Sequence, residues 1–248
     1  MITRTFSLIA GISEYRERTL KKNGIRCWDD FLSTDYIDGI PLHKKSHFDR
    51  QIIKAFRNLE CRNAPFFYAN LPASQQWRLY DHFRKDCAFL DIETTGLNQR
   101  MNRITTISVF DGAGTETLIN GIDLTSNSLA RLMSRFKMLV TFNGSMFDVP
   151  FIKSHFPGIR FNMPHMDLRW ACRRVGLTGG LKAIEKQLGI ARDEDIKNVS
   201  GLHAVRLWKR WELLKDKDAL DTLVRYNQED VINLKTLADH VYHRLSNK

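Results

Sequence analysis

The stretch CAFLDIETTGL, residues 87–97, predicts a buried strand that ends in two acidic side chains. Residues i and i+2 of a strand point to the same face of a sheet, so Asp91 and Glu93 project together while Ile92 faces the core. Two adjacent carboxylates at the end of an apolar strand are unfavourable unless a cation neutralises them, and hard divalent ions such as Mg²⁺ bind such oxygen ligands. Taken alone, the pair could equally mark a solvated strand end followed by a turn.

The segments that follow this strand predict an α/β fold with a mixed sheet. Further elements are expected in the order strand, strand, helix and strand, over 103–110, 116–121, 124–136 and 138–143. Asp111 and Gly112 supply the turn between the second and third strands. After Gly144 the pattern is helical for most of the remaining length, including 182–189, 202–215 and 218–245.

Two more acidic residues lie at comparable points of this pattern. Asp148 ends the stretch TFNGSMFD (141–148), just beyond the fourth strand and at a predicted helix start, where an acid would also suit an ordinary helix cap. In YNQED (226–230), the i,i+4 spacing puts Tyr226 and Asp230 on one face of a long helix. That face borders an apolar stripe formed by Val231, Leu234 and Leu237. The alternative is an ordinary amphipathic helix whose Asp faces solvent.

Three motifs in this order, DIETTGL, NGSMFD and YNQED, resemble the exonuclease motifs of the DEDD (DnaQ-like) superfamily. The four acids of that pattern fall on Asp91, Glu93, Asp148 and Asp230. Tyr226, four positions before the last acid, is typical of the DEDDy branch, and Arg225 stands where the other branch has His. The flanking sequence is most similar to the YprB-type RNase H-like domain over roughly residues 86–245. The resemblance implies an RNase H-like mixed sheet flanked by helices.

The resemblance also implies a two-metal mechanism with two Mg²⁺ or Mn²⁺ ions. Asp91 would bridge both ions, and Glu93 and Asp230 would complete the shell of one. Asp148 would hold the other, partly through water. Tyr226 would orient the attacking water, because a Tyr with an ordinary pKa near 10 is a poor general base.

Further site residues follow from the same resemblance. Thr94 and Leu97 would contact the terminal nucleotide, and Asn143 and Phe147 would line the substrate groove. Each has a structural alternative, since Leu97 and Phe147 could be core residues and Asn143 could close a turn. Asp167 either supports the active site or caps the helix that follows it, and we favour the cap.

Residues 1–85 form a basic region with 15 Lys and Arg against 9 Asp and Glu. An apolar segment ending at Gly11, a basic helix, the stop signal Asn23-Gly24 and a second helix resemble a helix-hairpin-helix module, although Ser13 stands where Gly is usual. Such hairpins present backbone N–H groups and basic side chains to phosphates. Candidate phosphate contacts are Arg16, Arg18, Lys21 and Lys22, which could also form an ordinary solvated helix face. We therefore expect two domains, a helical one over 1–85 and the RNase H-like one over 86–248.

The composition of the 248-residue chain is that of a globular protein, with 43% hydrophobic and 27% charged residues. No apolar run approaches the roughly 20 residues of a membrane span, and the N-terminus carries no secretory signal, so we expect a cytoplasmic protein with no membrane partner. Four scattered cysteines predict reduced thiols rather than a disulfide framework or a zinc site: Cys27, Cys61, Cys87 and Cys172. The net charge of +10 favours a polyanionic partner.

These observations favour a metal-dependent exonuclease that acts on nucleic acid, and the resemblance to the DEDD superfamily implies the 3′→5′ polarity. DNA is favoured over RNA because of the hairpin-like N-terminal region, and single-stranded ends suit the fold because the terminal nucleotide has to reach the metals. An RNA exonuclease and an RNase H-like endonuclease are the enzyme alternatives. A non-catalytic nucleic-acid-binding module is the alternative of another class, and the presence of all four acids argues against it.

Overall fold

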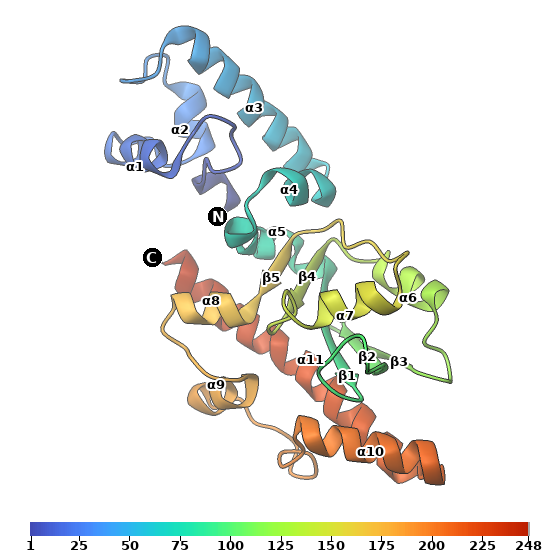
Figure 1. The fold of residues 1–248 in the computed structure, drawn as a ribbon. Helices are drawn as coiled ribbons and strands as arrows, with labels where there is room; N and C mark the ends of the chain where they lie inside the picture. Colours follow the sequence, from blue (N-terminus) through green and yellow to red (C-terminus); the bar gives the residue numbers. More distant parts are fainter. Residues whose placement is uncertain (248) are drawn as a thin grey trace. The chain divides into compact units, whose positions relative to one another are not determined.

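The computed structural model describes residues 1–247, which form two compact units (Figure 1). The first comprises Met1–Phe83 with Asn162–His165, and the second comprises Arg84–Phe161 with the residues from Met166 onward. Lys248, the last residue of the domain expected over 86–248, lies outside the described residues.

The first unit is helical. Its α-helices are α1 (Glu14–Lys22), α2 (Trp28–Ser33), α3 (Leu42–Glu60), α4 (Ala64–Asn70) and α5 (Tyr80–Phe83), with 3₁₀ turns at Ile2–Arg4 and Ala73–Leu79. Ser13 caps α1 by accepting a hydrogen bond from the Arg16 amide at 3.2 Å. Gly24 follows the end of α1 at a φ of +87°, which a residue with a side chain rarely adopts. Large aromatic side chains fill the core of this unit, including Phe6, Trp28, Phe31 and Phe67.

The second unit is built on a five-stranded mixed sheet. Its strands are β1 (Cys87–Thr94), β2 (Ile104–Phe110), β3 (Thr115–Ile119), β4 (Met138–Thr141) and β5 (His165–Asp167), in the spatial order β3-β2-β1-β4-β5. β1 pairs antiparallel with β2 and parallel with β4, and it is therefore the central strand. The four strands expected from the sequence are confirmed. β5 was not expected, because three residues are too short to show the alternation that marks a strand.

Helices cover this sheet and connect its strands: α6 (Ser126–Met133), α7 (Asp148–His155), α8 (Leu168–Arg174), α9 (Leu181–Leu188), α10 (Gly201–Leu214) and α11 (Lys217–Ser246). The long helix α11 packs against β1, β2 and α10 (Figure 1). It begins where the Asp216 side chain accepts a hydrogen bond from the Ala219 amide at 3.0 Å. Its buried face includes the expected stripe Val231, Leu234 and Leu237. The α/β fold with a mixed sheet flanked by helices is confirmed.

Two expectations from composition concern the cysteines and the length of the apolar helices. The four cysteines carry free thiols. Within residues 1–247, every helix is too short or too polar to span a bilayer.

Candidate active site

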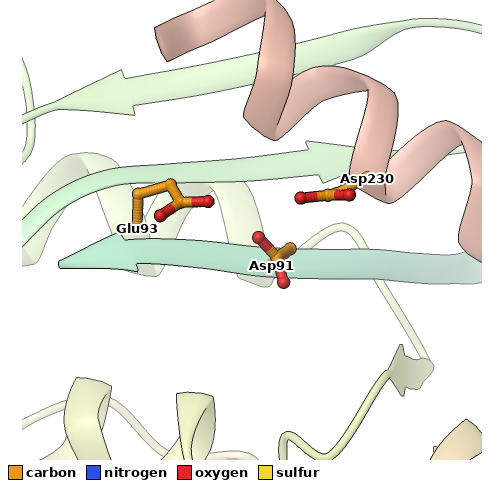
Figure 2. A group of neighbouring side chains, drawn as sticks. All are labelled: Asp91, Glu93 and Asp230. Atoms are coloured by element: carbon orange, nitrogen blue, oxygen red, sulfur yellow. The ribbon is translucent and has the colours of Figure 1, made fainter. Parts of the chain in front are cut away.

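The central strand and the longest helix bring three carboxylates together. Asp91 and Glu93 extend from the same face of β1, and Asp230 reaches them from α11 (Figure 2). One carboxylate oxygen from each residue lies within 4.8 Å of the other two. Asp230 is buried rather than solvent-facing, with 5% of its surface exposed. We refer to Asp91, Glu93 and Asp230 as the acidic triad.

Burial and mutual repulsion disfavour charge on the triad. Burial, followed by the neighbouring acids Asp230 and Asp148, raises the pKa of both Asp91 and Glu93 well above its ordinary value. Burial raises the pKa of Asp230 to about 6, although Arg192 acts in the opposite direction. Oxygen ligands that repel one another in a confined site suit a hard divalent cation, whose charge offsets the repulsion. The triad therefore fits Mg²⁺ or Mn²⁺.

Asp148 reaches the central strand from a third element, α7. It is the first residue of α7, and its Oδ1 accepts a hydrogen bond at 3.2 Å from the amide of Ile92, which lies between Asp91 and Glu93. Burial raises the pKa of Asp148 to about 7. The structure thus places all four acids of the sequence motifs at one end of the central strand, with Asp148 outside the compact triad.

Two neighbouring residues of α11 complete this region. Tyr226 is buried one helical turn before Asp230, and the ammonium of Lys182 lies over its ring at 4.8 Å from the centroid. Asn227 is fully buried, accepts a hydrogen bond from Thr106 at 2.9 Å and donates one to Asp91 Oδ2 at 2.7 Å. Asn227 was not expected from the sequence, although a polar residue on the buried face of an amphipathic helix is a signal for such a role.

The turn between β4 and α7 holds Asp148 in place. Asn143 adopts a φ of +65°, and a Cβ at Gly144 would lie 2.3 Å from Thr141 Oγ1, so this close approach requires glycine. Asp167 accepts hydrogen bonds from the amides of Asn143 (2.8 Å) and Ser145 (3.0 Å). It also caps α8, so its carboxylate both supports the turn and begins the next helix.

The residues expected to contact substrate have different environments. Thr94 is buried and donates a hydrogen bond to the Gly96 carbonyl at 2.8 Å. Leu97 is 86% exposed, so the alternative of a core residue is wrong for it. The Asn143 carboxamide oxygen accepts a hydrogen bond from Arg169 at 2.8 Å. Phe147 is half-buried, with its ring 5.3 Å from that of Phe151.

The basic residues of α1 belong to the first unit, and three of the four contact groups within their own region. Arg16 donates to the Gly11 carbonyl at 2.8 Å, and Lys21 pairs with Glu17 at 2.6 Å. Arg18 lies 3.5 Å from Glu14, and Lys22 is exposed. These contacts reduce the number of α1 donors that point freely into solvent.

A buried cation beside the triad was also not expected from the sequence. Arg192 lies between α9 and α10 and bonds to Asp230 at 2.5 Å and to Glu185 at 2.6 Å. Its partners are 38 and 7 residues away in the chain. No local pattern marks such a contact, because only the folded chain brings these groups together.

A mixed sheet with clustered acids on its central strand, crossed by a long C-terminal helix, defines an RNase H-like nuclease fold. The chain belongs to the RNase H superfamily, whose family profile matches residues 88–242. This match is to the superfamily as a whole, and the DEDDy branch and the YprB type are narrower groups within it.

Three solved structures are similar to this chain. A family B DNA polymerase from Pyrobaculum calidifontis superposes with a TM-score of 0.51 and 16% identity, over 62% of this chain and 24% of the polymerase chain. The present chain thus spans about a quarter of that polymerase. Brucella melitensis NrnC gives a TM-score of 0.47 and 21% identity over 68% of this chain and 78% of its own. A structure described as the apo form of a nuclease gives a TM-score of 0.49 and 21% identity, over 71% of this chain and 79% of its own. Comparison with curated protein sequences gives no match.

Proposed function

We propose that this protein is a divalent-metal-dependent 3′→5′ exonuclease that hydrolyses nucleic acid, with single-stranded DNA as the favoured substrate, and releases nucleoside monophosphates. The observation that carries the proposal is the acidic triad, with Tyr226 one turn before Asp230 on the same helix. The 3′ polarity rests on the resemblance of the three motifs to the DEDDy pattern. The preference for DNA rests on the hairpin-like pattern of residues 1–85.

The side chains have distinct roles in this proposal. Asp91, Glu93 and Asp230 would hold one divalent ion, and Asp148 would hold a second together with Asp91. When bound, two such ions activate a water molecule and stabilise the leaving oxyanion. Burial, followed by repulsion from Asp230, raises the pKa of Tyr226 above its ordinary value, so its hydroxyl keeps its proton. Tyr226 therefore orients water through hydrogen bonds and does not act as a general base.

A basic pocket beside the β4–α7 turn supports a polyanionic substrate. The pocket has a volume of about 410 Å³ and is lined by Phe142, Asn143, Arg169, Arg173 and the residues 177–180. Asn143 also lies in the connection from β4 to Asp148, so the pocket and this one acid share a structural element. Guanidinium groups bind phosphodiester oxygens, which suits a nucleic-acid strand entering next to the acids.

Arg173→Gln tests this pocket. The variant loses one phosphate contact, so its KM for single-stranded DNA is expected to rise roughly 3- to 10-fold. The salt dependence of binding is expected to fall, and kcat is expected to stay nearly unchanged. Arg131→Gln on α6 is the matched control, because it removes one exposed arginine outside the pocket. Equal KM values for the two variants would contradict a role for the pocket in binding.

The function itself is tested by digestion of single-stranded DNA labelled at the 5′ or the 3′ end, with Mg²⁺ or Mn²⁺ and with EDTA as control. A 5′-labelled product ladder that shortens progressively is expected, together with immediate release of a 3′ label as mononucleotide. Matched RNA strands measure the DNA preference, and a circular strand detects internal cutting. Cleavage of the circular strand would favour an RNase H-like endonuclease. Binding without cleavage of either polymer would contradict the proposal that the protein is an enzyme.

A further inference from the structure

Arg192 is a charged side chain buried next to the acidic triad. It lies in the segment that joins α9 to α10, and 6% of its side chain is exposed. Its guanidinium makes a forked pair of hydrogen bonds to Glu185 of α9, from Nε to Oε2 at 2.6 Å and from Nη2 to Oε1 at 2.7 Å. A fork of this kind fixes both the position and the plane of the guanidinium.

The same guanidinium holds one oxygen of Asp230. Nη2 donates to Asp230 Oδ1 at 2.5 Å. Glu185 accepts a further hydrogen bond at 3.1 Å from Asn233, which lies one helical turn after Asp230 on α11. The contacts therefore begin and end on neighbouring turns of one helix, and they fix the Asp230 carboxylate relative to the helix that carries it.

The network adds little net charge to the triad. The positive charge of Arg192 is offset by Glu185, and Glu229 Oε2 lies 4.0 Å from Nη1. An isolated guanidinium would repel a divalent cation, whereas a guanidinium paired with a carboxylate acts chiefly through the direction of its hydrogen bonds. The geometry of the contact with Asp230 is thus its main consequence for the triad.

We propose that Arg192 is a positioning residue for a divalent-cation site formed by the acidic triad. By holding Oδ1, Arg192 leaves Asp230 a single free carboxylate oxygen with a fixed direction, so Asp230 binds the cation through one oxygen. Partners that orient metal ligands in this way contribute substantially to metal affinity. The inference rests on the metal site of the proposed function and assigns a role to a residue outside the three acidic motifs.

Calorimetric titration of the full chain with Mn²⁺ tests this role without relying on catalysis. Arg192→Lys keeps the charge and removes the fork, and its Mn²⁺ Kd is expected to rise about 10- to 100-fold. The double variant Glu185→Gln with Arg192→Met removes both members of the forked ion pair, so Glu185 is not left as a buried carboxylate without its counter-ion. It is expected to lose Mn²⁺ affinity to a similar extent. Thermal unfolding in EDTA establishes that each variant is folded before titration.

Arg225→Gln is the matched control. Arg225 ties the same α9–α10 segment to α11 through Asp193 at 2.7 Å and Asp195 at 3.4 Å. These pairs are exposed, and neither acid belongs to the triad. Because exposed pairs contribute little, the Mn²⁺ Kd of this variant is expected to stay within about twofold of wild type.

The outcomes separate this inference from the proposed function. Mn²⁺ binding by the wild type with unchanged Kd in the Arg192 variants overturns the positioning role and leaves the metal site intact. Tighter binding in the double variant also overturns it, because Arg192 would then compete with the cation. An equal loss of Mn²⁺ affinity in Arg225→Gln also overturns it, because any contact that attaches the α9–α10 segment to α11 would then have the same effect. A wild type that binds no Mn²⁺ overturns both proposals.

Discussion

Asp91→Asn is expected to lower the metal-dependent rate of nucleic-acid cleavage by about 10³-fold or more. Asp91 is the member of the triad on the central strand that Asn227 also fixes, through the hydrogen bond to its Oδ2. The substitution removes one negative charge from the cation site at nearly constant volume. An asparagine oxygen can still accept the hydrogen bond from Asn227, so the fold is expected to persist.

Asp111→Asn is the matched control for this prediction. Asp111 lies in the exposed turn between β2 and β3, where its Oδ1 accepts bonds from the amides of Ala113 and Gly114. This variant loses the same unit of charge outside the site, and its cleavage rate is expected to match wild type. The measurement is the initial rate on 5′-labelled single-stranded DNA in Mn²⁺. Substantial cleavage activity in Asp91→Asn would contradict a role for these acids in the mechanism.

In EDTA, the stability of the protein is expected to fall as the pH rises from about 4 to about 7. An unfolded Asp ionises near pH 4, whereas burial raises the pKa of Asp148 to about 7 and that of Asp230 to about 6. Below pH 4 these carboxyls are protonated in both states. Between the pKa of each carboxyl in the unfolded chain and its higher pKa in the folded chain, the unfolded chain binds fewer protons than the folded one. Rising pH therefore favours unfolding in this range. Above pH 7 the contribution of Asp148 is constant.

Asp148→Asn isolates this contribution. From pH 5 to pH 8 in EDTA, the Tm of the wild type is expected to fall by roughly 5 °C more than that of the variant. Saturating Mn²⁺ is expected to raise the Tm of the wild type at pH 8, because the cation binds the ionised acids of the folded state. Thermal unfolding followed by circular dichroism measures both effects. Parallel pH curves for the two proteins would show that Asp148 does not ionise differently in the folded state.

Local periodicity predicted the central elements of the fold. The alternation in β1 separated Asp91 and Glu93 from the buried Ile92, and the helical spacing of α11 placed Tyr226 and Asp230 on one face. Both patterns follow from the backbone geometry of a single element, so they are readable without knowledge of its neighbours. Elements too short to show a period, such as β5, escaped the same analysis.

The roles of several polar side chains depended on contacts between distant segments. Asp167 was expected chiefly to cap a helix, and the structure adds its hydrogen bonds to the β4–α7 turn. Asn227 reaches Asp91 across 136 positions of the chain. Such contacts arise from the packing of whole elements, and the same residues at the same spacing would lie on a solvated surface in another fold.

The sequence by itself determined that the chain forms a mixed α/β sheet and carries four acids in three ordered motifs, because hydrophobic alternation and motif order are local properties. Only the tertiary structure decided that three of these acids converge within 4.8 Å of one another, and that the buried Arg192 holds Asp230. Distances of this kind are set by how α11 and the α9–α10 segment pack on the sheet. That packing depends on contacts made throughout the unit, which no single stretch of sequence encodes.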